Sequence, residues 1–199
     1  QTAASGGGVV FIDFSDTEHP AVDRLDVDLQ SFGYALCILD SGAGHEGLTA
    51  VYRSITDELR AVCRVFGREV LRDVPEEAFL ARLPEVRAAA GDRAVNRAFH
   101  VYAENRRAQE EKRALGRGDF DRFLELVRES GRSSAMYLQN IIPTGSAAAQ
   151  ELMVTIALCE RILEGRGAVR VHGGGFGGTA QARSVVGVWR GGGGGVGRG

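Results

Sequence analysis

Hydrophobic positions place strands near both ends of the chain and helices between them. A run rich in β-branched and aromatic residues, Val9–Phe14, predicts a first strand. The nearly continuous apolar run Gly33–Asp40 predicts a second strand that is covered on both faces. Gly167–His172 predicts a third strand, and a fourth is expected to begin at Thr179. The sequence therefore predicts strands on either side of a helical block.

Apolar residues in the middle of the chain recur at the spacing of α-helices. The predicted helices run from about Leu48 to Gly67, over Val74–Leu83, from Asp92 to about Leu115, from Asp119 to Gly131, and from Ser146 to Gly165. Three of them begin at a polar residue suited to cap a helix: Asp92, Asp119 and Ser146. Residues 104–113 carry charges of both signs, which is typical of a solvated helix face. Strands at both ends of a helical block indicate an α+β fold.

Composition narrows the class of protein. A chain of 199 residues suffices for one sizeable domain or two small ones. A net charge of −2 does not favour nucleic acid as a partner. No run of 18 apolar residues predicts a membrane span, and the first residues do not resemble a signal peptide. Three widely spaced cysteines, Cys37, Cys63 and Cys159, are typical of free thiols in a reducing compartment and lack the pairing of a zinc site. We expect a cytoplasmic protein with no metal site of its own.

The most distinctive stretch is Gly173–Gly178, which has five glycines in six residues. Such a backbone adopts positive φ freely and can approach another group closely. Its successive N–H groups can form a concavity for an anion such as a phosphate. A tight turn between two strands is the simpler alternative. No Lys-Ser or Lys-Thr follows, so the stretch is not a P-loop, and no long helix follows to make a dinucleotide fingerprint.

Four segments together resemble one family. They are Asp40-Ser41-Gly42-Ala43-Gly44-His45 with Leu48, Thr49 and Tyr52 after it, Ala114-Leu115 with Gly118-Asp119-Phe120, Glu129-Ser130-Gly131 through Tyr137-Leu138-Gln139-Asn140, and Val171-His172 with the glycine stretch and Thr179. In this order and spacing, the chain up to about Ala182 is similar to the C-terminal part of a galactokinase, a member of the GHMP kinases. The resemblance implies a GHMP-kinase-like fold of a two-layer sheet and helices, with the N-terminal domain mostly missing.

That family phosphorylates the anomeric hydroxyl of galactose with ATP and Mg²⁺. The resemblance implies that Tyr52 contacts the sugar, although a core tyrosine is the alternative. It implies that Gly174, Gly175 and Gly177 let the backbone approach the ATP phosphates, or that they only support the active-site loops. We expect Tyr52 and the glycine stretch to border one shared hollow. His172, His45 and Asp40 are interpreted as structural rather than catalytic or metal-binding residues.

Other parts of the family pattern are missing here. There is no N-terminal sugar motif and no Ser-rich phosphate loop, and the catalytic base would precede Gln1. We therefore expect a truncated piece, without measurable kinase activity and with weak or no ATP binding. Alternatives are another GHMP sugar kinase, or a galactokinase-like sensor of sugar and ATP without catalysis. The expected division is a remnant of the N-terminal domain over 1–40, a C-terminal domain over 41–182, and a poorly ordered glycine-rich tail over 183–199. The oligomeric state is not predicted.

Overall fold

The computed structural model of this chain describes residues 8–16, 18–44, 48–176 and 178–185. The strands are β1 (Val9–Asp13), β2 (Ala21–Leu25), β3 (Tyr34–Asp40), β4 (Gly167–Val171) and β5 (Thr179–Val185). The α-helices are α1 (Thr49–Val65), α2 (Glu76–Ala81), α3 (Leu83–Ala90), α4 (Asp92–Gly116), α5 (Phe120–Ser133) and α6 (Glu151–Leu163). Leu29–Phe32 and Leu71–Asp73 are 3-10 turns, and Ser134–Leu138 is a π-turn that continues α5. This mixture confirms the predicted α+β class.

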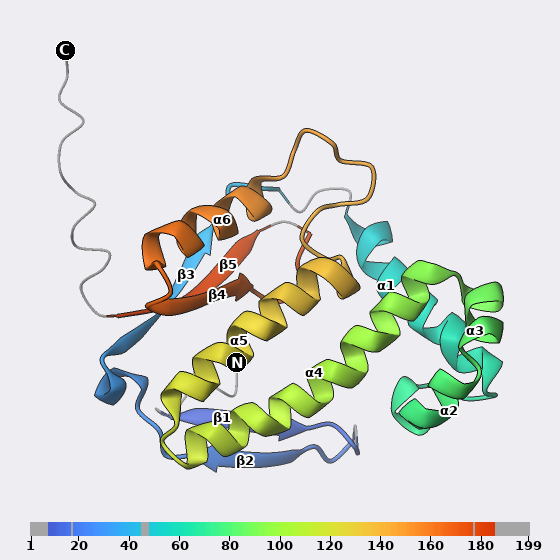
Figure 1. The fold of residues 1–199 in the computed structure, drawn as a ribbon, viewed down its shortest axis with the longest axis horizontal. Helices are drawn as coiled ribbons and strands as arrows, with labels where there is room; N and C mark the ends of the chain where they lie inside the picture. Colours follow the sequence, from blue (N-terminus) through green and yellow to red (C-terminus); the bar gives the residue numbers. More distant parts are fainter. Residues whose placement is uncertain (1–7, 17, 45–47, 177, 186–199) are drawn as a thin grey trace.

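The strands form two antiparallel sheets. Among the described strands, β1 pairs only with β2. The other sheet has the order β3-β5-β4, in which Cys37 and Val169 both lie opposite Ala182, on its two sides. Figure 1 shows α6 on one face of the three-stranded sheet and α5 on the other, with α4 beside α5 and the β1–β2 hairpin beneath them. The two sheets are therefore separate layers, joined through the helices.

The prediction that both faces of β3 are covered was wrong. Cys37 and Leu39 pack toward α6, but Leu36 and Ile38 on the opposite face are 49% and 50% exposed. α5 packs on β4, and β3 is the far edge strand of this sheet. A strand with one covered face usually alternates between apolar and polar residues. β3 is apolar on its exposed face as well, so its sequence looks like that of a strand covered on both faces.

The first part of the helical block differs from the expectation in two places. The expected single helix over Val74–Leu83 is two helices, because α2 ends before Arg82 and α3 begins at Leu83. Pro84 lies in the first turn of α3, where its missing N–H costs nothing. α4 begins as predicted, but Asp92 does not cap it: the N-cap is Gly91, and Asp92 forms an ion pair with Arg87.

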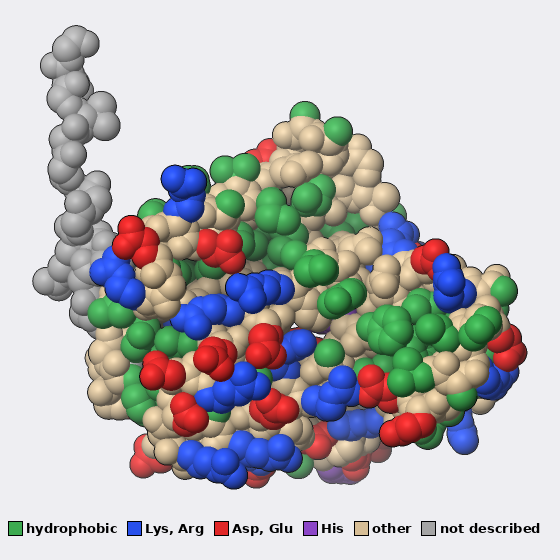
Figure 2. All heavy atoms as spheres, viewed as in Figure 1, with side chains coloured by type: hydrophobic (Ala, Val, Ile, Leu, Met, Phe, Trp, Pro, Cys, Tyr) green, Lys and Arg blue, Asp and Glu red, His purple; other side chains and the backbone are tan. Residues whose placement is uncertain are grey.

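The ends of α5 and α6 also correct the prediction. Asp119 caps α5 as expected, since its carboxylate accepts the N–H of Arg122 at 3.1 Å. Gly131 does not end that helix; a Cβ there would lie 3.0 Å from the carbonyl oxygen of Val169, so this glycine lets α5 approach β4. α6 begins at Glu151, five residues after Ser146. Its outer face exposes Val154, Leu158 and Ile162, and apolar side chains gather over α6 in Figure 2.

Two expected boundaries fall inside the three-stranded sheet. β3 pairs with β5, so residues 34–40 share a sheet with the later segment instead of belonging to a separate unit. β5 continues to Val185, and Ser184 is fully buried, although the tail was expected to begin at residue 183. The rest of the expected tail lies outside the described residues.

Candidate functional site at the glycine loop

The glycine stretch connects β4 to β5 as a tightly shaped loop. Gly173, Gly175, Phe176 and Gly178 have φ values of 64°, 83°, 59° and 81°. Phe176 is buried to 2% exposure, so the loop is anchored by an apolar side chain. A positive φ is strained for a residue with a Cβ. Burial of the Phe176 ring offsets that strain and keeps the residue in this conformation. Gly177 lies outside the described residues.

Tyr52 reaches this loop from α1. Its hydroxyl donates a hydrogen bond to the carbonyl oxygen of Gly175 at 2.5 Å. Its ring meets Phe176 edge to face, with ring centroids 5.4 Å apart. A Cβ on Gly174 would lie 2.9 Å from Cε1 of Tyr52. Burial raises the pKa of the Tyr52 hydroxyl, so the group stays a hydrogen-bond donor at neutral pH.

Asn140 holds the loop from the other side, and the sequence analysis gave it no role. Its side-chain amide donates to the carbonyl oxygen of Gly174 at 3.2 Å, and its own carbonyl accepts the N–H of Phe176 at 2.5 Å. A Cβ on Gly175 would lie 2.0 Å from that carbonyl oxygen. Asn140 was part of the segment that resembles galactokinases, which was the only signal available. Residue 175 must therefore be glycine because of Asn140, as well as for its φ.

The end of β3 supplies a third contact. The backbone N–H and the hydroxyl of Ser41 both donate to the carbonyl oxygen of Gly178, at 2.8 and 2.5 Å. Asp40 accepts the N–H of Gly42 at 2.9 Å, which agrees with its interpretation as a structural cap of this turn. His172 is exposed just past β4, and its N–H donates to the carbonyl oxygen of Thr179. His45 lies outside the described residues.

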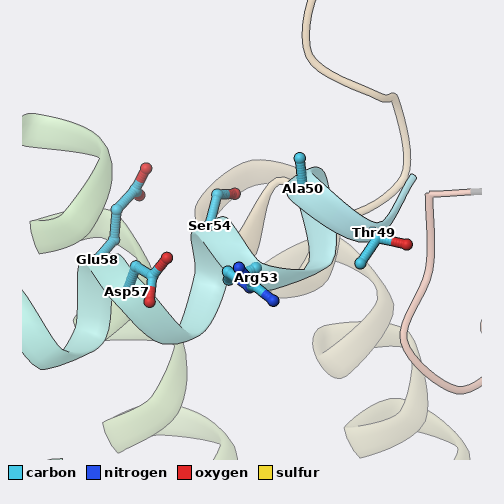
Figure 3. Close-up of a pocket in the computed structure, with 6 residues that line it drawn as sticks. All are labelled: Thr49, Ala50, Arg53, Ser54, Asp57 and Glu58. Atoms are coloured by element: carbon cyan, nitrogen blue, oxygen red, sulfur yellow. The ribbon is translucent and has the colours of Figure 1, made fainter. Parts of the chain in front are cut away.

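Neither of two cavities in the described part of the chain forms the expected shared hollow. One, of about 530 Å³, lies along α1 and is lined by Thr49, Ala50, Arg53, Ser54, Asp57 and Glu58 (Figure 3). The other, of about 1000 Å³, lies among β1, α1, the 3-10 turn 71–73 and α4. Tyr52, Gly174 and Gly175 line neither cavity. Tyr52 instead contacts the glycine loop directly through its hydrogen bond to Gly175.

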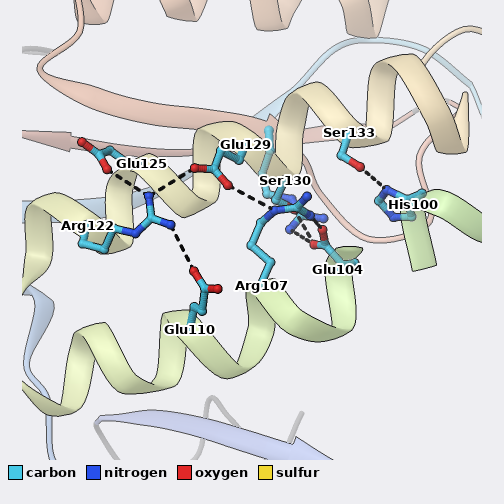
Figure 4. A network of polar contacts seen from close by, with 10 residues as sticks. His100, Glu104, Arg107, Glu110, Arg122, Glu125, Glu129, Ser130 and Ser133 are labelled. Carbon is cyan, nitrogen blue, oxygen red and sulfur yellow. Dashed lines mark hydrogen bonds and ion pairs between the residues drawn. The ribbon is translucent and has the colours of Figure 1, made fainter. Parts of the chain in front are cut away.

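A network of charged side chains lies behind the site, between α4 and α5 (Figure 4). His100 pairs with the hydroxyl of Ser133 at 2.8 Å, one residue before the π-turn. One turn along α4, Glu104 pairs with Arg107, Ser130 and Arg170. Burial, opposed by the charge of Glu104 and reinforced by Arg107 and Arg170, lowers the pKa of His100. The expectation that 104–113 is simply a solvated face was wrong for Glu104 and Arg107, which are largely covered.

Two absences apply to the described part of the chain. No group of three or more histidine, cysteine, aspartate or glutamate side chains there could hold a metal ion. None of the helices in residues 8–16, 18–44, 48–176 and 178–185 is long and apolar enough to cross a membrane.

Comparisons with known proteins give the same family as the sequence motifs. No family model matches the chain. The galactokinase of Actinobacillus pleuropneumoniae is 32% identical over 146 residues, which is 73% of this chain and 36% of that protein. The galactokinase of Mannheimia succiniciproducens is 31% identical over 152 residues, which is 76% of this chain and 37% of that protein.

The chain is homologous to galactokinases. The crystal structure of Lactococcus lactis galactokinase complexed with galactose shares its fold, with a TM-score of 0.68 at 20% identity, over 90% of this chain and 44% of that one. The predicted fold class is confirmed. The homologous region of this chain spans a little over a third of the curated galactokinases that it matches.

Proposed function

We propose that this chain supplies part of a galactokinase site, in which Tyr52 contacts galactose and the glycine loop lies beside the phosphates of ATP. One observation carries the proposal. The Tyr52 hydroxyl donates to the Gly175 carbonyl at 2.5 Å, although the two residues are 123 positions apart in the sequence. The hydrogen bond joins the tyrosine that the resemblance implies is a sugar contact to the glycine loop that it implies lies near the ATP phosphates.

The backbone of the loop fits a phosphate. Gly173 and Gly174 are exposed, and their N–H groups make no hydrogen bond to any residue that the structure describes. N–H groups left open on a left-handed turn are suited to bind an anion. When ATP is bound, it supplies the phosphoryl group that is transferred. Among the described residues no group of three or more histidine, cysteine, aspartate or glutamate side chains could hold a metal ion, and we assign no magnesium ligand among them.

The protein groups at the site orient substrate. The hydroxyl of Tyr52 donates to the Gly175 carbonyl, which fixes its position beside the loop, and we assign it to orienting a sugar hydroxyl. No described side chain is assigned as general base. Phosphoryl transfer depends on positioning and charge stabilisation from several segments. We therefore infer that residues 1–199 alone have no measurable kinase activity and bind ATP weakly.

A chimaera tests this function. In the galactokinase of A. pleuropneumoniae, the region that this chain matches is replaced by the corresponding sequence of this chain, and phosphorylation is assayed with ATP, Mg²⁺ and a panel of hexoses. We expect galactose to be preferred and the Tyr52→Phe variant to have a higher KM for it. A folded chimaera that phosphorylates no hexose contradicts the proposal, and a preference for another sugar favours a different GHMP kinase. Calorimetry that shows tight ATP–Mg²⁺ binding to residues 1–199 contradicts the inference of weak binding.

A further inference from the structure

A fully buried guanidinium lies behind the candidate site. Arg97 on α4 has 0% exposure and is the largest fully buried side chain among the described residues. Burying a charge is costly unless partners satisfy it. The proposed function gives no role to Arg97, so its partners show what its burial accomplishes.

The partners of Arg97 belong to two different segments. Its Nη1 donates to the hydroxyl of Ser54 at 3.1 Å and to a carboxylate oxygen of Glu58 at 2.9 Å, both on α1. Its Nε donates to the carbonyl oxygen of Leu138 at 3.1 Å, at the end of the π-turn. One rigid, planar group therefore fixes the distance between α1 and the residues that follow α5.

These two segments are the ones that hold the glycine loop. Tyr52, two residues before Ser54, contacts Gly175 from one side. Asn140, two residues after Leu138, contacts Gly174 and Phe176 from the other. The glycine loop is therefore held between two segments, one on α1 with Tyr52 and one after α5 with Asn140. Arg97 forms hydrogen bonds to both segments, close to Tyr52 and to Asn140.

A second arginine shares Glu58 with Arg97 but has a different partner in the segment after α5. Arg93, one turn earlier on α4, donates to Glu58 at 2.9 Å and to the hydroxyl of Thr144 at 3.2 Å, and it is 38% exposed. Glu58 thus has a cationic partner even without Arg97. Among the hydrogen bonds of the described residues, Arg97 alone reaches the Leu138 carbonyl, so the link to Leu138, two residues before Asn140, depends on Arg97, whereas Arg93 reaches only Thr144 beyond it.

We propose that Arg97 is a positioning residue for the candidate site: it sets the spacing between Tyr52 and Asn140 and thereby the conformation of the glycine loop. The identity of the ligands, galactose and ATP, rests on the proposed function; the effect of Arg97 on the loop conformation does not. Lysine keeps the charge beside Glu58 but lacks the planar fork that reaches three acceptors. Arg97→Lys therefore separates a positioning role from charge compensation alone.

Hydrogen exchange followed by NMR on the 199-residue chain tests the proposal. The readout is the amide of Phe176, which donates to Asn140; amides of β4 and β5 report on the fold. We expect Arg97→Lys to speed exchange at Phe176 about tenfold while the strand amides stay unchanged. Arg106→Met is the matched control, since Arg106 also lies on α4 and forms an ion pair, with Glu76, away from the loop. An unchanged Phe176 amide in Arg97→Lys overturns the proposal.

Two further measurements keep the result decisive. If Arg97→Lys does not fold, Ser54→Ala removes one of the same partners, and about threefold faster exchange at Phe176 is expected. No change at Phe176 overturns the proposal.

In an active chimaera, Arg97→Lys should raise the KM for galactose, whereas Arg106→Met should not. An inactive chimaera refutes the proposed function alone, because exchange still decides the role of Arg97. An active chimaera with unchanged KM and exchange in Arg97→Lys refutes the positioning role alone.

Discussion

The seam under α6 and the glycine loop are held by opposite kinds of interaction. The seam joins α6 to one face of the β3-β5-β4 sheet through apolar side chains, among them Leu152, Ile156, Leu163, Val169, Val171, Ala180 and Ala182. The loop, at one end of the same sheet, is held by hydrogen bonds from Tyr52, Asn140 and Ser41 and by close backbone contacts.

This difference separates stability from site geometry. Apolar burial is non-directional and stabilises in proportion to the area removed from water. Hydrogen bonds contribute less to net stability but fix distances and directions. Substitutions in the seam should therefore lower the free energy of unfolding and leave the loop in place, whereas substitutions at the loop should move it at a smaller cost in stability.

The largest expected loss of stability is in the seam. Leu163 is 2% exposed and lies at the end of α6 beside Gly167, at the far end of β4 from the glycine loop. We expect Leu163→Ala to lower the free energy of unfolding by about 3 kcal/mol, because it leaves a cavity. Urea unfolding measures the loss, and exchange at the Phe176 amide should be unchanged under native conditions. Faster local exchange at Phe176 would show that the seam and the loop are coupled.

Gly175→Ala tests the loop itself. The new Cβ would lie 2.0 Å from the Asn140 carbonyl, at a residue with φ of 83°. Because the loop can shift away from Asn140, we expect a loss of about 2 kcal/mol in the free energy of unfolding rather than global unfolding. The chemical shifts of Tyr52 and Asn140 should change as the loop moves.

Gly173→Ala is the matched control for that variant. Gly173 also has a positive φ, 64°, but a Cβ there would meet nothing within 4 Å. It should carry only backbone strain of about 1 kcal/mol, with Tyr52 and Asn140 undisturbed. Equal effects of the two variants would mean that strain, and not contact with Asn140, requires glycine at residue 175.

The same contrast explains what the sequence could predict. Hydrophobic periodicity located β1, β3, β4 and β5 and most of α1, α4 and α5, because apolar burial leaves a repeat in the sequence, but it did not locate the exposed strand β2. It failed at helix ends: Gly131 was expected to end a helix but allows a close approach to β4, and Pro84 was expected to follow a helix but lies in the first turn of α3. One residue type serves both purposes, and only the packed structure decides between them.

The sequence indicated that Tyr52 and the glycine loop lie together, and their roles toward sugar and ATP stay a prediction. The glycine loop and Tyr52 came from motifs, and the structure places them in contact. Asn140 lay in one of these motifs without an assigned role, and Arg97 lay in none of them. Their roles depend on hydrogen bonds to backbone atoms of residues 34 and 41 positions away, and backbone acceptors carry no signature in the sequence. Hydrogen bonds from a side chain to a distant backbone carbonyl can therefore be identified only in the folded structure.

Tyr52→Phe removes the hydrogen bond between the Tyr52 hydroxyl and the Gly175 carbonyl. The variant keeps the ring against Phe176 and loses the hydrogen bond to Gly175, so we expect about 1 kcal/mol less stability. Tyr137→Phe is the control, because Tyr137 on the π-turn is 42% exposed. Urea unfolding of both variants gives the comparison. If they are equally stable, the Tyr52 hydroxyl does not help to hold the loop.

The smallest expected effect is a pH dependence confined to the polar side of the sheet. The seam has only thiols to titrate, and burial raises the pKa of Cys159, so acid should not affect it. His100, buried against Ser133 and facing Glu104, Arg107 and Arg170, has a lowered pKa, which means that the folded protein favours its neutral form.

The sign follows from that preference. The stability that neutral His100 contributes is fully present above its unfolded pKa, about 6.5, and is lost as pH falls through the lower folded value. Between pH 7 and pH 5, unfolding free energy should therefore fall in the unmodified chain and fall less in His100→Gln, measured by urea unfolding at each pH. Because Ser133 directly precedes the π-turn that leads to Asn140, the same acidification should loosen the Phe176 amide before the amides of the seam strands. Parallel slopes for the two proteins would instead assign the acid sensitivity to carboxylates such as Glu104, whose pKa is lowered because Ser130, Arg170 and Arg107 outweigh the effect of burial.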